Sequence, residues 1–474
     1  MTFKKINAWL HLWLGLLSGI VVFVVSITGC IYVFENEIRD LIEKWRFVTP
    51  QETAFLSPTQ LTSFAQKHLK DGQKATGVSY HGRSQAAIVT FFSGRPEGGK
   101  KPEVKQQFSK KEGVSTPDNK QQERGGKNKK AGEKAGGKRG GKFTSVYMNP
   151  YTGETLKVKT VSRGGGADAE FDFFRFILNG HRALWLPYNI GRPIVGSAVL
   201  IFVFLLISGI ILWWPKKWKN KAIRDKSFKI KWSGSLKRVN YDFHNVLGFY
   251  SMLILLVISF TGLVWSFQWF SKSLYWVTSG GKTLEERRRP SSDTTQLAAF
   301  EPSSVDRIWQ KLPANQKNSG SIYLNIPREN ADVISATVYH VQGAYYKSDQ
   351  YFFDQYTLKE VKSASPFAGK YSEASVPDKI RRMNYDLHVG AIMGIPGKII
   401  AFIASLISAS LPVTGFLIWW NKRKKSKKEK GKKKTGASTS ETLIQPQVKR
   451  PVSRRLKSLE KELAVLDIVE PKPI

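Results

Sequence analysis

Residues 6–34 read INAWLHLWLGLLSGIVVFVVSITGCIYVF, an apolar stretch that contains no Asp, Glu, Lys or Arg. A helix rises 1.5 Å per residue, so about 20 such residues cross the ~30 Å hydrocarbon core of a bilayer. Three further stretches have the same character: residues 193–215, 245–271 and 399–421. The sequence therefore predicts an all-α membrane core of four transmembrane helices.

The positive charge is concentrated beside the ends of these stretches. A formal net charge of +37 could indicate nucleic-acid binding, but Lys4 and Lys5 precede the first stretch, and basic runs at 216–238 and 422–434 follow the second and fourth. By the positive-inside rule these flanks are cytoplasmic. We therefore predict a multi-pass protein with both termini in the cytoplasm, the lipid bilayer as its partner and no nucleic acid.

The first stretch has the basic start and apolar run of a secretory signal peptide. Its apolar character continues to Phe34 without a small-residue cleavage pattern, which favours a retained helix. The single cysteine, Cys30, lies within it and excludes an internal disulfide or a Cys-rich metal site.

The two long connections are predicted to be external α+β modules, each with a capped helical stretch followed by alternating strands such as ISATVYHV. A Gly/Lys-rich insertion, residues 95–142, is expected to be disordered, and residues 453–469 to form a short amphipathic helix. The predicted order is helix 1 (1–34), first module (35–190), helix 2 (191–215), basic cytoplasmic loop (216–240), helix 3 (241–271), second module (272–387), helix 4 (388–421) and basic cytoplasmic tail (422–474).

The membrane helices form duplicated pairs. The spacing of His11, Gly15, Thr28 and Gly29 in the first helix is repeated by His244, Gly248, Thr261 and Gly262 in the third; Gly191, Ser208 and Gly209 of the second helix match Gly397, Thr414 and Gly415 of the fourth. His181 and His388 precede these last two sets. Each membrane helix therefore has one histidine beside it.

Two sets of polar and small residues have an ordinary structural interpretation. In RVNYDFH (238–244) and RMNYDLH (382–388), the Asn and Asp residues are expected to cap helix amides; they are Asn240, Asp242, Asn384 and Asp386. Glycines in bilayers commonly permit close helix contact, and this is the expected role of Gly29, Gly209, Gly262 and Gly415.

One histidine at a helix end is usually an interfacial or packing residue, but four on duplicated motifs indicate a ligand set. Imidazole suits haem iron, zinc or copper, and without a carboxylate or cysteine inside the helices two imidazoles best suit axial haem ligation. The topology pairs His11 with His244 near the cytoplasmic face and His181 with His388 near the external face. No CxxCH motif is present, so we predict two non-covalent, b-type haems.

Gly15 and Gly248 lie one helical turn after their histidines. They could leave room for a flat macrocycle, and close helix packing is the open alternative. The remaining histidines, His68, His81 and His340, have no carboxylate or cysteine at ligand spacing and are expected to be structural.

The motifs together resemble the PepSY-associated transmembrane proteins, often called iron-regulated membrane proteins. The resemblance covers nearly the whole chain. It rests on WLHLWLGL with the TG that follows, NGHRALW with GRP and SGIILWWPKK, YDFHNVLGFY with TG, and TGFLIWWNKRKK. VYMNPYTGETL (146–156) is similar to the close of a PepSY module, whereas the second module has Leu358 where the first has Gly153.

The resemblance implies a bacterial inner-membrane oxidoreductase that reduces a ferric siderophore or other ferric chelate outside the cytoplasm. Its haems would be held by His11, His181, His244 and His388, and a cytoplasmic donor or a quinol would supply the electrons. Two alternatives are a non-enzymatic, membrane-anchored PepSY binding or regulatory protein and a transporter component for iron-siderophore uptake. No catalytic side chain is identified.

Overall fold

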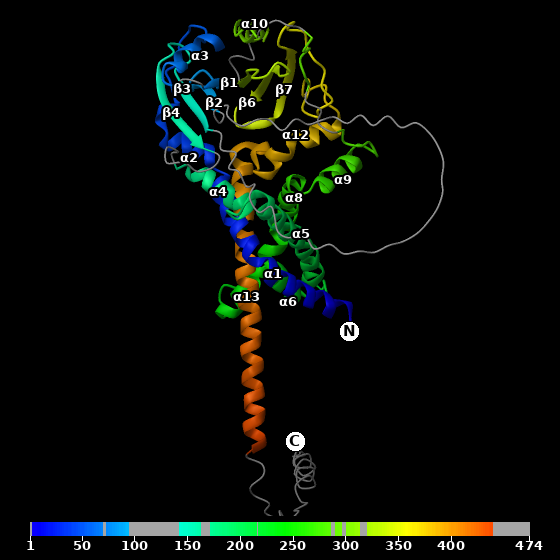
Figure 1. Ribbon diagram of the computed structural model, residues 1–474. Coiled ribbons are helices and arrows are strands. Elements are labelled where there is room, and N and C mark those ends of the chain that lie inside the picture. Colours follow the sequence, from blue (N-terminus) through cyan, green and yellow to red (C-terminus); the bar gives the residue numbers. More distant parts are fainter. Residues whose placement is uncertain are drawn as a thin grey trace, which may run out of the picture. The chain divides into compact units, whose positions relative to one another are not determined.

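The computed structural model describes residues 2–69, 73–93, 142–162, 171–215, 217–285, 290–295, 300–312 and 320–438 (Figure 1). The Gly/Lys-rich insertion expected to be disordered lies outside these residues, except for Lys142, which begins a strand. The helix expected over residues 453–469 also lies outside them. The chain divides into two compact units, residues 1–416 and 417–474, and all the contacts described below lie within the first.

The described residues contain four helical spans that are long and apolar enough to cross a membrane: Phe3–Tyr32, Tyr188–Trp213, Leu236–Ser266 and Ala391–Lys424. They correspond to α1 (Phe3–Tyr32), α5 (Tyr188–Trp213), the consecutive α7 (Leu236–Asp242), η2 (Phe243–Leu247) and α8 (Gly248–Ser266), and the membrane part of α13 (Gly394–Ser438) with the short η3 (Ala391–Met393) before it. The third span, expected to continue to residue 271, ends at Ser266 because Phe267 adopts an extended backbone conformation.

A mixed core holds the spans together. Val22, Phe202, Leu255 and Ala404, one from each span, share a buried apolar cluster, and the Ser26 hydroxyl donates to the Ser408 hydroxyl at 2.9 Å between α1 and α13. Residues 33–187 and 267–390 leave the spans at one end, called here the sheet end; residues 214–235 join them at the other, the loop end.

The sequence predicted a separate module in each of the two long connections. Instead, the two connections together form one antiparallel sheet (Figure 1). Its order is β4-β3-β2-β1-β5-β6-β7. The strands are β1 (Lys74–Tyr80), β2 (Ala87–Ser93), β3 (Lys142–Met148), β4 (Thr155–Ser162), β5 (Ser321–Asn325), β6 (Val333–Val341) and β7 (Ala344–Asp354). The halves join where β1 pairs with β5, in a register that sets Val78 opposite Leu324. Separate modules would leave both strands as unpaired edges, and their pairing satisfies those backbone groups.

Two helices, α3 (Pro58–Gln66) and α10 (Ser303–Lys311), cover one face of the sheet and enclose its core. The predicted cap is present at α3, where Ser57 and Gln60 form a capping box. It is absent at α10, whose N-cap residue, Pro302, makes no side-chain cap hydrogen bond. Asp306 of α10 accepts a hydrogen bond from the Ser57 hydroxyl at 2.9 Å, and the Trp309 ring stacks on Tyr80 of β1 with 4.2 Å between centroids. The halves therefore share one core.

Short helices connect the sheet to the membrane spans. They are α2 (Glu35–Ile42), η1 (Lys44–Arg46), α4 (Phe173–Ala183), α9 (Gln268–Thr278) and α12 (Val376–His388), with α6 (Lys221–Phe228) at the loop end. Arg39 of α2 binds Asp172, the N-cap of α4, at 2.7 Å. Buried Arg382 of α12 donates to the carbonyls of Ser348 and Pro366 at 2.9 and 2.8 Å. These contacts hold α4 and α12 beneath the sheet.

The shared core gives a stability prediction. Trp309→Ala should cost about 3–5 kcal/mol, the usual range for removing a large buried aromatic side chain, because it empties the space between α10 and β1. Scanning fluorimetry of the detergent-solubilised protein should show a lower unfolding midpoint. Trp276→Ala is the matched control because Trp276 is 55% exposed, and equal shifts for both variants would contradict the shared core.

Candidate functional site: two histidine pairs

The structure brings the four histidines together in two pairs. His11 of α1 and His244 of η2 lie at the loop end, with ring centroids 6.3 Å apart and planes at 86°. His181 of α4 and His388 of α12 lie at the sheet end, with centroids 6.0 Å apart and planes at 71°. His181 contacts Thr28 of α1, and residues 11 and 28 of that helix are about 25 Å apart along its axis at 1.5 Å per residue.

Each histidine reaches a hydroxyl on a facing membrane helix through its Nδ1 atom. The same relation occurs four times: His11 with Ser208 at 2.6 Å, His244 with Thr414 at 2.9 Å, His388 with Thr261 at 2.9 Å and His181 with Thr28 at 3.4 Å. These serines and threonines belong to the duplicated SG and TG dipeptides. Sequence reasoning identified the repeat but not this contact.

The hydrogen-bond pattern places the proton on Nδ1. The hydroxyl protons have other acceptors, since Thr414 donates to the Ser410 carbonyl at 2.9 Å and Ser208 to the Leu205 carbonyl at 3.0 Å. Nδ1 of His181 also lies 2.9 Å from the Val25 carbonyl, and Nδ1 of His388 lies 3.0 Å from the Ile258 carbonyl. A carbonyl can only accept, so the neutral ring carries its hydrogen on Nδ1 and a lone pair on Nε2.

The glycine of each dipeptide lies against an imidazole ring. A Cβ at Gly29 would stand 3.2 Å from Cε1 of His181, and one at Gly415 would stand 3.3 Å from Cε1 of His244; Gly262 and Gly209 repeat this at His388 and His11, at 3.4 and 3.5 Å. These glycines therefore lie at close helix contacts, as predicted, and the group in contact with each is an imidazole ring. They admit the ring that the neighbouring hydroxyl binds.

Gly15 and Gly248 have a different environment. A Cβ at Gly15 would meet only Leu205, at 3.9 Å, and one at Gly248 only Leu411, at 3.6 Å. These are ordinary van der Waals separations, so packing within the described residues does not require glycine at either position. Their predicted contact with a macrocycle stays a prediction.

The capping role expected for the Asn residues is wrong, because Ser235 and Ser375 are the N-caps of α7 and α12. Asn240 instead donates to the Thr414 carbonyl at 3.1 Å and Asn384 to the Thr261 carbonyl at 3.2 Å. Asn7 does the same to Ser208 at 3.1 Å. Each of these asparagines lies four residues before a histidine. Its amide binds the backbone carbonyl of the Ser or Thr whose hydroxyl contacts that same histidine. The spacing is visible in the sequence, but the role of Asn7 was not predicted from it.

The Asp residues of the same motifs are also not caps. Asp242 accepts from the Lys231 amide at 3.1 Å and from Arg238 at 2.8 Å. Asp386 accepts from the Tyr345 amide of β7 at 2.9 Å. Each aspartate lies two residues before a histidine and binds the segment beside that helix. Asp242 binds the basic loop, and Asp386 binds the sheet.

The other histidines lie apart from these pairs. His81 contacts the Ser321 hydroxyl at 3.1 Å, and burial lowers its pKa to about 4, with the positive charge of Arg46 acting in the same direction. His340 binds Asp349 at 3.0 Å. Nowhere in the described ranges do three His, Cys, Asp or Glu side chains gather as a metal-binding group. Each pair therefore offers two imidazole donors, a set that suits an ion whose other ligands come from a macrocycle.

The family model described as PepSY-associated TM region matches residues 8–422. The chain belongs to this family. The match runs from within the first span to within the fourth and includes the sheet and all four paired histidines. The chain is therefore a multi-pass membrane protein. No curated protein matches it.

The hydroxyl contact gives a test of the ligand geometry. Thr414→Val keeps the side-chain volume but removes the hydroxyl that accepts the His244 Nδ1 proton, so the predicted haem affinity at the loop-end pair should fall about 10–100-fold, as for other partners of metal-ligating histidines. Haem titration of the haem-depleted protein measures this. Thr278→Val is the matched control, because Thr278 makes the same bond to its own helix carbonyl, at 2.9 Å to Leu274, without contacting a histidine. Equal affinities in Thr414→Val and the parent protein would contradict the role of the hydroxyl.

Proposed function

We propose that this PepSY-associated TM chain binds two b-type haems and conducts electrons across the bilayer to a ferric siderophore or other ferric chelate. His11 and His244 would hold one haem, and His181 and His388 the other. The observation that carries the proposal is the fourfold Nδ1 contact, which leaves Nε2 of each ring as a ligand. When bound, the haems supply one-electron chemistry by alternating between ferric and ferrous iron.

The separation of the rings supports bis-histidine ligation. Imidazole nitrogens bind metal ions at about 2.0–2.1 Å and lie about 1 Å from the ring centroid, so an ion held between two Nε2 atoms separates the centroids by about 6 Å. The observed separations are 6.3 and 6.0 Å. A Cβ at Gly15 or Gly248 would meet a leucine only at an ordinary separation, 3.9 or 3.6 Å. These glycines lie one turn from the loop-end histidines and would accommodate the macrocycle there.

The residues around each pair would orient the ligands and tune them. The hydroxyl and carbonyl groups that accept from Nδ1 fix each ring and raise the basicity of Nε2. Asn7, Asn240 and Asn384 hold the facing backbone in place. The protein thereby presents preorganised donors to the iron, and no protein side chain needs to react.

The charge distribution supports the direction of electron flow. Lys4, Lys5 and the basic residues 217–238 flank the loop end, so by the positive-inside rule that end would be cytoplasmic and the sheet external. The bacterial inner membrane is the location that the family resemblance implies. A cytoplasmic donor or a quinol would reduce the centre at His11 and His244. One electron would then pass through the centre at His181 and His388 to each ferric ion. Oxygen-donor chelators hold ferrous iron far less tightly, so reduction releases it.

The histidine pairing predicts the effect of single substitutions. His11→Ala and His244→Ala should perturb the same low-spin haem and block reduction of the other by a cytoplasmic donor. His181→Ala and His388→Ala should perturb the second haem and leave the first reducible but no longer oxidised by external ferric chelate. Absorption spectra, haem extraction into acidic organic solvent and reoxidation kinetics measure these effects.

His68→Ala is the control, and its spectra and rates should match those of the parent protein. Loss of the same spectral species in His11→Ala and His181→Ala would contradict the pairing. Colourless protein from haem-replete cells would exclude the proposed cofactor.

The proposed orientation can be measured by cysteine labelling in a Cys30→Ser background. Thr152→Cys and Ser372→Cys lie on exposed segments beyond the sheet end, and Ser233→Cys lies on the exposed loop. An impermeant thiol reagent added to intact inner-membrane vesicles of cytoplasm-inside orientation should label the first two only. Labelling of Ser233→Cys alone would reverse the orientation.

A further inference from the structure

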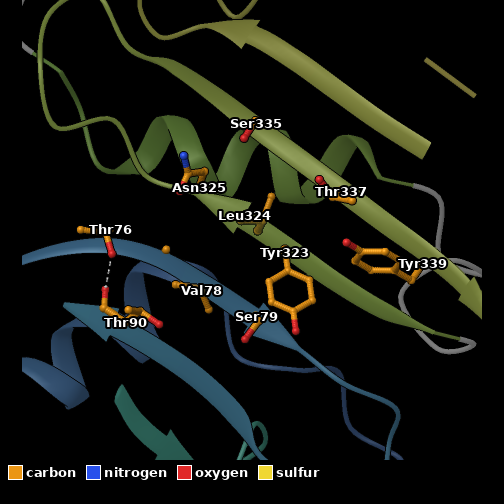
Figure 2. A pocket seen from close by; sticks show the side chains of 11 residues that line it. Thr76, Val78, Ser79, Thr90, Tyr323, Leu324, Asn325, Ser335, Thr337 and Tyr339 are labelled. Atoms are coloured by element: carbon orange, nitrogen blue, oxygen red, sulfur yellow. Dashed lines mark hydrogen bonds between the residues drawn. The ribbon is translucent and has the colours of Figure 1, made fainter. Parts of the chain in front are cut away.

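The face of the sheet opposite α3 and α10 contains a hollow of about 390 Å³. Figure 2 shows that strands of both halves line it: Thr76, Ser79 and Thr90 from β1 and β2, and Tyr323, Asn325, Ser335, Thr337 and Tyr339 from β5 and β6. The hollow exists because β1 pairs with β5. Its volume falls within the range of small-molecule sites, about 300–1,000 Å³.

Among the residues that the structure describes, the lining is rich in hydroxyl groups and contains no charged side chain. Ser, Thr and Tyr hydroxyls and the Asn325 amide can donate to or accept from a polar ligand. A ligand with a large net charge would lose hydration there without gaining an ion-pair partner in the lining, which is costly. The hollow therefore suits a polar ligand of little or no net charge.

A continuous row of aromatic rings leads from this hollow to the sheet-end histidine pair. The ring centroids follow one another from Tyr323 to Tyr339 at 5.7 Å, to Tyr345 at 5.4 Å, to Tyr385 at 5.2 Å, to Trp265 at 6.4 Å and to His388 at 5.1 Å. Tyr323 and Tyr339 line the hollow itself (Figure 2). The row therefore joins a ligand-sized space to a histidine of the proposed outer haem.

The backbone holds this row in place. Tyr345 is fixed to α12 by the hydrogen bond from its amide to Asp386 at 2.9 Å. Tyr385 and His388 lie one turn apart on the same helix. Burial raises the pKa of each tyrosine in the row, so the four phenols stay protonated and neutral at physiological pH.

We propose that the hollow binds a neutral ferric chelate, such as a ferric ion held by three hydroxamate groups, and that the aromatic row couples it to the centre at His181 and His388. This inference rests on the proposed function. One electron passes from the ferrous haem iron to the ferric ion, which becomes ferrous while the haem iron becomes ferric. The rings mediate the transfer and are themselves neither oxidised nor reduced. No proton transfer is required.

Binding can be tested without electron transfer. Gallium(III) tris-hydroxamate has the charge and shape of the ferric complex but is not reduced under these conditions. Calorimetry on the purified full-length protein should detect its binding, and gallium(III) tris-catecholate, with a charge of −3, should bind at least about tenfold more weakly, a difference of about 1.4 kcal/mol.

Filling the hollow should abolish this binding. Thr337→Trp and Ser335→Trp place a large ring in the space, whereas Thr152→Trp, on an exposed turn outside the lining, is the control. Haem content and unfolding midpoints verify that each variant folds. Parent-like affinity in both hollow-filling variants, or tighter binding of the catecholate, would overturn the proposed site.

The row is tested by single-turnover kinetics. The reduced protein is mixed with ferric tris-hydroxamate, and haem oxidation is followed by absorbance. Tyr345→Phe keeps the ring and should keep the rate, whereas Tyr345→Leu should slow it about tenfold, equivalent to about 1.4 kcal/mol in activation free energy, with unchanged gallium-chelate affinity. Equal rates of haem oxidation in Tyr345→Phe and Tyr345→Leu would contradict the proposed role of the aromatic row in electron transfer.

The outcomes separate the two proposals. A haem-containing protein that reduces the ferric chelate equally well after Thr337→Trp keeps its proposed function, and the inferred site fails. A protein that binds the gallium chelate in the hollow but contains no haem loses its proposed function and keeps the site.

Discussion

The hydrogen bond from histidine Nδ1 to a serine or threonine hydroxyl on a facing helix is the constraint on which the rest of the membrane core depends. It recurs at all four histidines. The residue after the hydroxyl residue is a glycine each time: a Cβ would crowd the ring at Gly29 and Gly415, at 3.2 and 3.3 Å, and would make an ordinary contact at Gly262 and Gly209, at 3.4 and 3.5 Å. The hydrogen bond also fixes the tautomer, so the same contact that packs the helices prepares Nε2 as a ligand.

In each half of the chain, the helix that provides one of these histidines also provides the hydroxyl and glycine that contact another. In the first half, α1 contributes His11 at one end and receives His181 at Thr28 and Gly29 near the other. In the second half, the span containing η2 and α8 contributes His244 and receives His388 in the same way. The repeated motifs therefore give two histidine pairs at opposite ends of one bundle, each built from one histidine of either half. A single repeat could complete neither pair.

The sequence predicted those features that depend on local pattern or on connectivity. Long uncharged runs predicted the four spans, and the alternation of helix directions predicted that His11 would meet His244 and that His181 would meet His388, as the structure places them. Other features depend on contacts between distant residues. Asn240 looked like a cap because capping is local, yet its partner is the Thr414 carbonyl. Likewise, no local sequence pattern predicts that β1 pairs with β5 rather than remaining an edge strand. Whether the pairs hold haem stays a prediction.

Electron paramagnetic resonance of the oxidised, purified protein tests the central claim most directly. The imidazole planes cross at 86° and 71°, and nearly perpendicular axial imidazoles give ferric haem a strongly anisotropic low-spin signal. If both histidine pairs hold haem, spin quantitation should give two such centres per chain. A high-spin ferric signal, a single centre or the absence of a haem signal would contradict this claim.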